Sequence, residues 1–260
     1  MPLPEGWQIT HLASASSSND VALDIIKQTG RQAHRTCIIV DEQTKGRGRN
    51  GRFWHSAPGD GLYLSAIYAP SVPQKDWAGL SFVTSLALFQ AVTGIYPQLS
   101  PHLHLKWPND LVTSHCKLAG ILLEAVSDFV IIGCGVNVRA APDIMVRGLK
   151  AGSLADILAE QERPEDRIIS PSELGEALLG CLDPLLDLFE KDGMPALLQL
   201  WRQECDMFGR DISLTLPSGM LIGKCEGIDD EGRLILVDNA ERRHIISTGD
   251  VEILSRVTAS

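Results

Sequence analysis

The residues best suited to chemistry lie in a short glycine-rich segment in the N-terminal half of the chain. Its cations fall within eight positions: Lys45, Arg47, Arg49 and Arg52. They alternate with glycines that expose backbone N–H groups, and like charges this close repel one another. An anionic ligand would supply the missing counter-charge and order the segment; the alternative is a solvated basic loop. Trp54, just beyond, offers a flat apolar face to a heterocycle.

The same segment matches a dinucleotide-binding pattern, but its context argues against that interpretation. Residues 46–51 fit G-x-G-x-x-G, in which a helix must open at the third glycine so that its N-terminus meets a phosphate. Residues 53–61 contain a proline and two glycines and do not start a helix. No acidic residue for a ribose and no Gly-Lys-Ser/Thr follow at the required distance. A Rossmann-type or P-loop nucleotide site is therefore disfavoured.

A second candidate group is the turn Lys106-Trp107-Pro108-Asn109-Asp110. The carboxylate and amide in it have no helix N-terminus nearby to cap. One interpretation places Asp110 near a phosphate and a metal, with Lys106 as its counter-ion. The other is an ordinary turn with Trp107 packed in the core. Spacing alone does not choose between the two.

Two further polar residues stand at the ends of apolar runs. Lys117 is either a solvated strand end, the usual environment of lysine, or a cation at a pocket mouth beside the N–H of Gly120. Asn137 is costly to bury unless it is hydrogen-bonded, so it either pairs with an adenine edge or makes a structural bond. The histidines show no metal-binding spacing and no serine has a nucleophile-elbow context. We expect no metal held by protein ligands.

These residues need a scaffold in which strands and helices are interspersed. Ser17–Asn19 can cap a helix over 21–30, and apolar periodicity predicts a core helix over 75–94. The other predicted elements are strands at 37–40, 62–68 and 103–106, a hairpin of 118–126 with 129–138, and helices at 173–190 and 194–204. The glycines at 120, 133 and 135 weaken the hairpin, which suggests close approach of a ligand to the backbone.

Beyond Gly209 the apolar residues recur at every second position. Short runs near 212–216, 221–222, 234–237, 244–246 and 251–254 are separated by turns, a pattern typical of a small antiparallel barrel. We therefore predict an α+β chain with a mixed-sheet domain over 1–207 and a β-barrel over 208–260. A barrel of about 50 residues is small for a lone domain, so it should lean on the larger one.

Composition and charge limit the classes of partner. The 260 residues are 44 % apolar with a net charge of −10, which fits a globular protein and argues against general nucleic-acid binding. The first 110 residues nevertheless carry a net charge of +1. Six cysteines without a C-x-x-C pair predict reduced thiols. With no visible signal peptide or membrane-spanning apolar run, we expect a cytoplasmic protein that binds no membrane.

Taken in order, five motifs resemble those of biotin protein ligases. They are Ser17-Ser18-Asn19, residues 43–54 (QTKGRGRNGRFW), Lys106-Trp107-Pro108-Asn109-Asp110, residues 117–122 (KLAGIL) and residues 133–137 (GCGVN). The resemblance implies a catalytic domain of the biotin/lipoate ligase type followed by a small SH3-like barrel. It also implies two reactions: biotin and MgATP form biotinyl-5′-AMP and pyrophosphate, and a lysine of a biotin carboxyl carrier protein then takes the biotin and releases AMP.

The same resemblance implies roles for individual residues. Biotin would contact Ser17, Ser18, Asn19, Gln43, Gly46, Arg47, Gly48, Arg49, Lys117 and Gly120. The nucleotide would contact Arg47, Arg49, Arg52, Trp54, Asn109 and Asn137. Catalysis would involve Arg49, Lys117, Asp110 and Lys106, with Asp110 organising a metal or the acceptor lysine. Two positions depart from the family pattern: Ser18 replaces the usual threonine and keeps a hydroxyl, and Cys134 replaces a small or aliphatic residue.

Two other functions remain open on the sequence. A lipoate–protein ligase shares the fold and the adenylation chemistry, although the arginine-rich loop and the Lys-Trp-Pro-Asn-Asp motif favour biotin. A non-catalytic sensor would bind biotin or its adenylate without labelling a protein; Lys117, Arg49 and Asp110 together argue against it. Some members of the family carry an N-terminal DNA-binding domain. Because the motifs begin at Ser17, we expect a monofunctional ligase without specific DNA binding. Its expected oligomeric state is a monomer or a homodimer.

Overall fold

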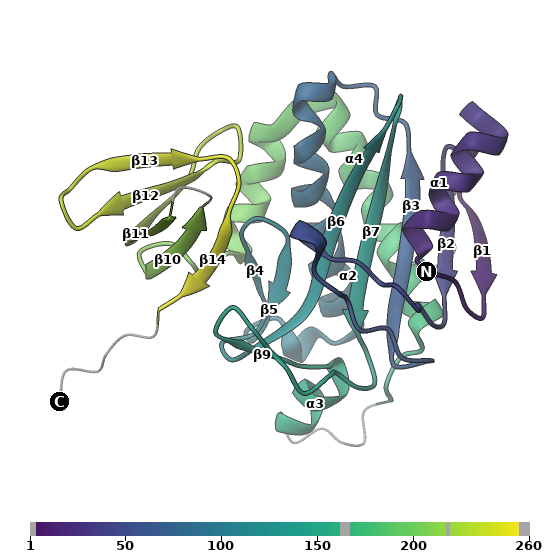
Figure 1. Cartoon of the computed structure of the whole chain (residues 1–260), viewed down its shortest axis with the longest axis horizontal. Coiled ribbons are helices and arrows are strands. Elements are labelled where there is room, and N and C mark those ends of the chain that lie inside the picture. The colour runs from purple at the N-terminus through teal and green to yellow at the C-terminus, as the bar shows by residue number, and fades with distance from the viewer. Residues whose placement is uncertain (1–3, 162–166, 217–218, 255–260) are drawn as a thin grey trace.

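The computed structural model describes residues 4–161, 167–216 and 219–254. Its larger part is built on a mixed sheet of nine strands (Figure 1), whose main path runs β1-β2-β3-β7-β6-β5-β4. In chain order these are β1 (Gln8–Leu12), β2 (Thr36–Val40), β3 (Gly61–Tyr68), β4 (His104–Lys106), β5 (Asp110–Val112), β6 (Cys116–Val126) and β7 (Phe129–Asn137). The short strands β8 (Met145–Val146) and β9 (Leu149–Ala151) pair with each other, and β9 pairs with β6.

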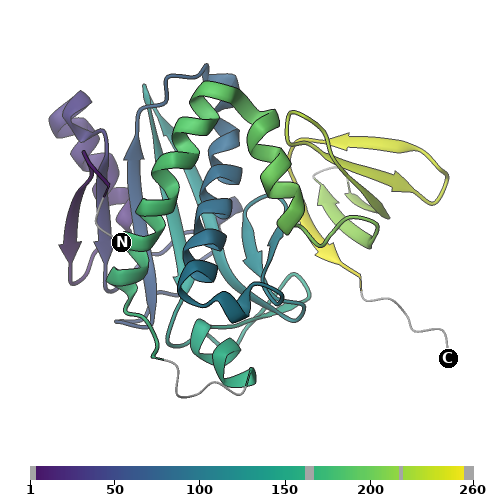
Figure 2. The ribbon, with the colours of Figure 1, turned by 180° about the vertical axis from the view of Figure 1, so that it is seen from behind.

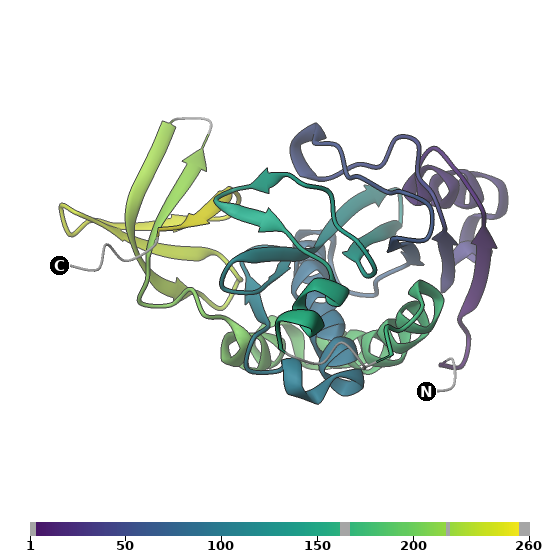
Figure 3. The same cartoon turned by 90° about the horizontal axis from the view of Figure 1, so that it is seen from below.

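The two faces of this sheet are covered differently. Helices α2 (Leu80–Ile95) and α4 (Pro171–Trp201) pack on one face (Figure 2). Helix α1 (Ser18–Thr29) and the long loops after β2 and β7 lie on the other (Figure 3). Side chains alternate accordingly along β2: Ile39 joins the large core with the helices, whereas Ile38 packs with Ile67 in a smaller core under α1. The α1 face is therefore the one left open to a ligand.

The predicted helices form, with shifted bounds. α1 begins after Ser17, whose hydroxyl accepts a hydrogen bond from the N–H of Asn19, and it ends at Gly30. The helix predicted over 75–94 is a 3₁₀ segment, Gln74–Gly79, that continues into α2. The two predicted C-terminal helices are the two arms of α4, which bends at Gly193, where φ is 75°. A further short helix, α3 (Leu154–Glu160), follows β9.

One helical stretch among the described residues is long and apolar enough to cross a membrane by length and composition. It spans Gln74–Ile95, with a mean hydropathy of 1.6 over a window that is 67 % buried in the fold. This stretch contradicts the expectation that the sequence holds no apolar run long enough to span a membrane. Its place explains its composition, because a helix that is apolar on all sides belongs in a core, and α2 packs against both the sheet and α4 (Figure 2).

A second sheet follows α4 and confirms the predicted C-terminal β unit. It contains β10 (Asp211–Leu216), β11 (Gly219–Ile228), β12 (Leu234–Asp238), β13 (Arg243–Ile246) and β14 (Asp250–Ile253), antiparallel in the order β13-β12-β11-β10-β14. It leans on the larger part, since the indole N–H of Trp107 donates to the carbonyl of Gly232 at 2.9 Å. Within the described ranges no pairing joins β13 to β14, so closure into an SH3-like barrel stays a prediction, as does the boundary after residue 207.

The strands that sequence reasoning missed are short or polar. β1 is an exposed edge strand, parallel to β2, and its polar residues hide the alternation. β5, β8 and β9 have two or three residues each, too few for periodicity to show. The β8–β9 hairpin turns through Arg147 and Gly148, both at positive φ, the backbone conformation that a two-residue type I′ turn requires.

Candidate active site

A cavity of about 1190 Å³, the space at its open mouth included, lies on the α1 face of the sheet. Its walls are the N-terminus of α1, the cationic loop (residues 45–54), strands β6 and β7, the β8–β9 hairpin and the start of β14. The sequence-predicted site residues that line it are Ser17, Ser18, Asn19, Gln43, Arg47, Gly48, Arg49, Arg52, Trp54, Lys106, Asn109, Asp110, Lys117, Gly120 and Asn137. Gly46 does not; a Cβ there would lie 2.4 Å from the carbonyl oxygen of Trp54.

One end of the cavity is a buried network of neutral hydrogen bonds. The N–H and the hydroxyl of Ser18 donate to Oε1 of Gln43 at 2.8 and 3.1 Å, and Nε2 of Gln43 donates to the hydroxyl of Ser56 at 2.8 Å. The hydroxyl of Ser65, from β3, lies within hydrogen-bonding distance of both the Ser18 hydroxyl and Oδ1 of Asn19. All five residues are buried, and a satisfied buried network is rigid. We call these residues the polar end.

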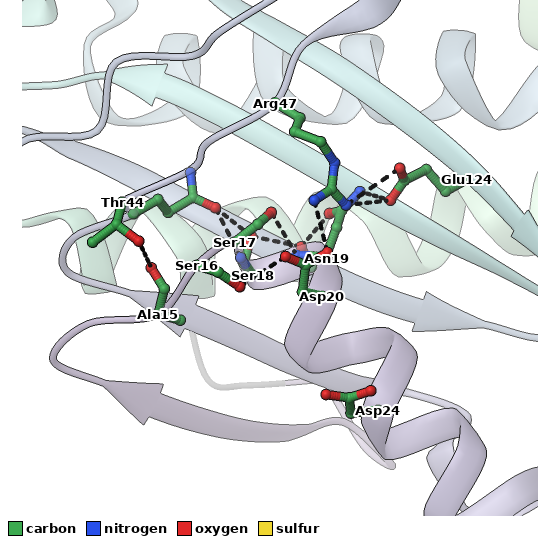
Figure 4. A network of polar contacts seen from close by, with 12 residues as sticks. Ala15, Ser16, Ser17, Ser18, Asn19, Asp20, Asp24, Thr44, Arg47 and Glu124 are labelled. Atoms are coloured by element: carbon green, nitrogen blue, oxygen red, sulfur yellow. Dashed lines mark hydrogen bonds and ion pairs between the residues drawn. The ribbon is translucent and has the colours of Figure 1, made fainter. Parts of the chain in front are cut away.

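The cationic loop is held beside the polar end by two carboxylates (Figure 4). Arg47 pairs with Asp20 of α1 at 2.7 Å and with Glu124 of β6 at 3.4 Å. Glu124 also accepts a hydrogen bond from Nδ2 of Asn19 at 2.6 Å. Burial alone would raise the pKa of Asp20, but hydrogen bonds from Ser16 and Arg47 bring it below its usual value. The Arg47 guanidinium is therefore already paired when no anionic ligand is bound.

Glycines make the floor of the cavity and allow side chains to pack closely there, whereas the close approach of a ligand stays a prediction. A Cβ on Gly133 would lie 2.6 Å from Oδ1 of Asn19, and one on Gly135 would lie 2.5 Å from the Trp54 ring. Trp54 therefore packs closely against β7, with Nζ of Lys117 5.9 Å from its ring centroid. Its buried Nε1 has no hydrogen-bond acceptor among the described residues. A buried donor without a partner is costly, and a ligand atom could satisfy this one.

The other end of the cavity is cationic. Nζ of Lys117 lies 2.6 Å from Oδ1 of Asp110, and Nζ of Lys106 lies 3.9 Å from the second oxygen of the same carboxylate. Lys117, not Lys106, is therefore the closer counter-ion of Asp110. Lys106 is 3 % exposed, and burial lowers its pKa even though Asp110 opposes this shift. These two lysines and the loop arginines form what we call the cationic end.

The loop arginines nearest this end reach across to the C-terminal sheet. Arg49 donates to Oδ1 of Asn109 and to the hydroxyl of Thr248, both at 3.2 Å. Arg52 forms a short ion pair with Asp250, the first residue of β14. The cationic loop is thus fastened at one side to α1 and β6 and at the other to the C-terminal sheet.

The acidic residues of the cavity do not fit a metal site held by the protein. The described residues contain no group of three or more His, Cys, Asp or Glu side chains that could bind a metal ion. Asp110 is already paired with two lysines and Asp250 with two arginines. Mg²⁺ commonly binds one or two carboxylates together with the phosphates of a nucleotide, so we treat it as part of an incoming MgATP.

Several residues that the sequence left open make structural contacts. Nδ2 of Asn109 donates to the carbonyl of Ile121, and Nδ2 of Asn137 donates to the carbonyl of Gly152 at 3.1 Å. Trp107 is buried in the core, as the structural interpretation of its turn expected. The roles of Asn109 and Asn137 toward a nucleotide remain predictions, but both residues also shape the cavity wall.

Sequence reasoning missed several residues of the site, among them Asp20, Ser56, Ser65, Glu124, Arg147 and Asp250. Ser65 stands within the apolar run of β3, where a buried serine without a partner would be costly; that was the only available signal. Glu124 stands near the end of an apolar stretch, where a single carboxylate gives no sign of a site. Arg147 and Asp250 reach the cavity from a hairpin tip and from a C-terminal strand, and no local pattern marks either.

Comparison with known proteins identifies the family. Residues 12–137 match the model described as "Biotin/lipoate A/B protein ligase family", and residues 207–254 match the "Biotin protein ligase C terminal domain". The "Biotin--[acetyl-CoA-carboxylase] ligase" of Mycobacterium tuberculosis is 30 % identical over 249 residues, which cover 95 % of this chain and 89 % of that protein. The chain belongs to the biotin protein ligase family. The resemblance inferred from its motifs is thereby confirmed.

Two further members of the biotin protein ligase family agree with this assignment. The "Bifunctional ligase/repressor BirA" of Bacillus subtilis is 30 % identical over 244 residues, 88 % of this chain and 72 % of that protein. The biotin protein ligase of Aquifex aeolicus, solved in complex with biotin and ATP, is 23 % identical and superposes with a TM-score of 0.77 over 95 % of this chain and 99 % of that chain. The similarity to the Aquifex aeolicus structure is a similarity of fold, and it extends over both sheets.

Proposed function

We propose that this chain activates biotin with ATP to biotinyl-5′-AMP and transfers the biotin to a lysine of a biotin carboxyl carrier protein. Membership of the family and the name of the Mycobacterium tuberculosis relative support the reaction and the class of acceptor. The observation that carries the proposal is that one cavity joins a neutral polar end to a cationic end. Biotin has the same division, with an uncharged ureido ring at one end and a carboxylate at the other.

The polar end suits a cyclic urea, which offers one carbonyl oxygen and two N–H donors. Ser18 and Ser65 bring hydroxyls that both donate and accept, and Asn19 brings an amide oxygen. The dithiolane ring of lipoate has neither an N–H donor nor an oxygen acceptor to offer these side chains, so it would gain no comparable hydrogen bonds. The network therefore favours biotin over lipoate.

The cationic end suits the first reaction. A carboxylate oxygen of biotin attacks the α-phosphorus of ATP, the bond from that phosphorus to the bridging oxygen breaks, and pyrophosphate leaves. Negative charge builds up on the phosphoryl oxygens, and fixed cations in a water-poor site stabilise it. Lys117, Lys106 and Arg49 line the cavity where this charge would lie, while Mg²⁺ would arrive bound to the outgoing phosphates.

The second reaction needs protection from water. The lysine amine of the carrier protein attacks the carbonyl carbon of the mixed anhydride, AMP leaves, and the amine loses a proton. Water can attack the same carbon, so the adenylate must stay covered until the carrier protein binds. The cationic loop and the β8–β9 hairpin line the cavity and are the segments we assign to this cover. We place the protein in the cytoplasm, where its six free thiols would stay reduced.

The test is ATP-dependent transfer of labelled biotin to a purified biotin-carrier domain, with lipoate and a lipoyl domain in parallel. The wild-type protein should label the biotin carrier and leave the lipoyl domain unlabelled. Arg49→Ala and Lys117→Ala should each slow transfer by about 10²-fold or more, because each removes a cation that stabilises the transition state. Arg31→Ala, which removes an exposed arginine outside the cavity, is the matched control and should retain full activity.

Each outcome bears on a different part of the proposal. No transfer of biotin by the wild-type protein would refute the proposed activity. Transfer of lipoate in place of biotin would reverse the choice of substrate. Wild-type rates in both cavity variants would refute the residue assignment while leaving the activity in place.

A further inference from the structure

Three side chains converge on one oxygen of Asp250. Arg52 and Asn50, from the cationic loop, and Arg147, from the tip of the β8–β9 hairpin, all donate to its Oδ2, Arg147 at 2.6 Å and Asn50 at 3.2 Å. The carboxylate side chain is 13 % exposed. Burial would raise the pKa of Asp250, but the hydrogen bond and charge of Arg52, with the charges of Arg147 and Arg49, hold it below its usual value. It is therefore an anion at neutral pH.

The two segments that meet at Asp250 are separate covers of the same cavity. The cationic loop follows β2 and contributes Arg49 and Trp54 to the lining, and the hairpin follows β7 and contributes Val146 and Arg147. About 95 residues separate Arg52 from Arg147 in the chain. Motion of one segment can therefore reach the other only through contacts in the fold. Figure 3 shows the two segments on the same side of the sheet. Asp250 links them through a third element, β14.

Asp250 is not what holds the C-terminal sheet in place. Trp107 donates to the carbonyl of Gly232, and Arg202 donates to the carbonyl of Ile228 at 3.0 Å. Phe82 packs close to Gly232 on the same side of the contact. These contacts lie at the α2 and α4 end of the sheet–sheet boundary and involve neither covering segment. Removing the Asp250 charge should therefore loosen both segments without undocking the sheet, while Arg49 still reaches Thr248 and Arg147 still reaches Thr215.

We propose that Asp250 is a positioning residue that fastens the cationic loop and the β8–β9 hairpin to the C-terminal sheet, so that the two covers close over the adenylate together. Two arginines around one carboxylate leave an excess positive charge, which an adenylate phosphate can share. The inference rests on the proposed function, since the molecule to be covered is biotinyl-5′-AMP. It assigns to the C-terminal sheet a direct part in keeping that anhydride from water.

The test compares Asp250→Asn, which keeps the shape and removes the charge, with Asp211→Asn, an exposed aspartate on β10 of the same sheet. Each protein is loaded with biotinyl-5′-AMP, and the loss of bound adenylate is followed without a carrier protein. Asp250→Asn should lose adenylate about tenfold faster or more, and Asp211→Asn at the wild-type rate. Arg147→Gln added to Asp250→Asn should give little further loss, because both changes break the same link. An unchanged rate of loss in Asp250→Asn would overturn the proposal.

A second measurement needs no substrate and separates this inference from the proposed function. Amide hydrogen exchange of the ligand-free proteins reports local opening. In Asp250→Asn, residues 47–53 and 145–151 should both exchange faster, whereas β10–β12 should not change. Faster exchange in only one segment, or throughout the C-terminal sheet, would contradict a link between the two covers. If the wild-type protein makes no adenylate, the proposed function fails, and this measurement still decides whether Asp250 joins the covers.

Discussion

The two ends of the cavity are built from different interactions. At the polar end, Ser18, Gln43 and Ser65 are buried, neutral and hydrogen-bonded to one another. At the cationic end, charged side chains from separate stretches of chain form ion pairs, and Arg52 is more than a third exposed. The polar end depends on fixed packing, whereas the cationic end depends on charges whose partners can change.

This difference shows how one cavity can hold a small molecule tightly and still admit a nucleotide. Rearranging a buried network leaves polar atoms unpaired, at about 1–3 kcal/mol for each group, so the polar end should be preformed. Exchanging one exposed ion pair for another costs little, since such pairs are each worth about 0–1 kcal/mol. The carboxylates Asp20 and Glu124 pair with Arg47 until phosphates replace them.

The largest effect is expected at Lys106, the most buried cation of the cavity. Lys106→Met keeps the bulk and removes the charge, so adenylate formation should fall by about 10²- to 10³-fold. The free energy of unfolding should stay the same or rise, because the ion pair with Asp110 is long at 3.9 Å and burying the charge is costly. Pyrophosphate exchange and a thermal midpoint measure the two. Lys75→Met, at an exposed lysine, is the control; equal activity in both variants would contradict the role.

The next largest effect is expected at the polar end. Gln43→Leu removes the acceptor shared by the N–H and hydroxyl of Ser18. Biotin should bind about tenfold to a hundredfold more weakly, since about 1.4 kcal/mol is tenfold in affinity, while the KM for ATP should change little. Calorimetric titration with biotin alone measures this, with Gln28→Leu on the exposed side of α1 as control. A larger change in the KM for ATP than in biotin affinity would contradict the assignment of biotin to the polar end and of ATP to the cationic end.

A smaller effect is expected at the exposed pair of Arg47 and Asp20. Asp20→Asn removes one ion pair of the Arg47 guanidinium. An ion pair this exposed stabilises a fold by about 1 kcal/mol or less. The KM for ATP should change by less than about fivefold at low salt and not measurably at high salt, where exposed charges are screened. Steady-state kinetics at two ionic strengths test this. A change that persists at high salt would mean that Asp20 belongs to a fixed network.

The smallest effect is on stability against pH. The pKa of Asp250 in the fold lies below its ordinary value of 3.8, so its contribution is present above that value and is lost as the pH falls through the lower one. The cations that face it are Arg49, Arg52, Arg147 and Lys106. The difference in unfolding free energy between wild type and Asp250→Asn should be constant from about pH 5 to 8 and shrink below about pH 4. Denaturant titrations across this range check it.

The sequence revealed site residues with unusual local patterns more readily than the residues that hydrogen-bond or ion-pair with them in the fold. The cationic loop, Lys117 and the glycines of β7 were found because their local patterns are unusual for a loop or a strand. Ser65 was missed because one serine in an apolar strand carries no periodic signal. Asp250 was missed because its partners, Arg52 and Arg147, lie far away in the chain, and ion pairs across such separations are set by the tertiary fold alone.

The same distinction applies to the elements. α1 was predicted because Ser17 caps it and Gly30 ends it, which are local features. The two arms of α4 were predicted from apolar periodicity, and Gly193 marked the bend between them. β1 was missed because it is an edge strand that gains its pairing from β2, and β8–β9 was missed because two- and three-residue strands depend on docking for their existence.

The most direct test of the contrast between the two ends is amide hydrogen exchange of the wild-type protein, first free and then saturated with biotin and MgATP. The account predicts that the N-terminal turn of α1 and the strands β3 and β7 are protected in both states, since their hydrogen bonds are buried before any ligand binds. Residues 47–53 should exchange faster than these elements in the free protein and become protected by at least about a further tenfold on loading. Equal protection of the loop in both states, or a polar end that becomes protected only with ligand, would contradict it.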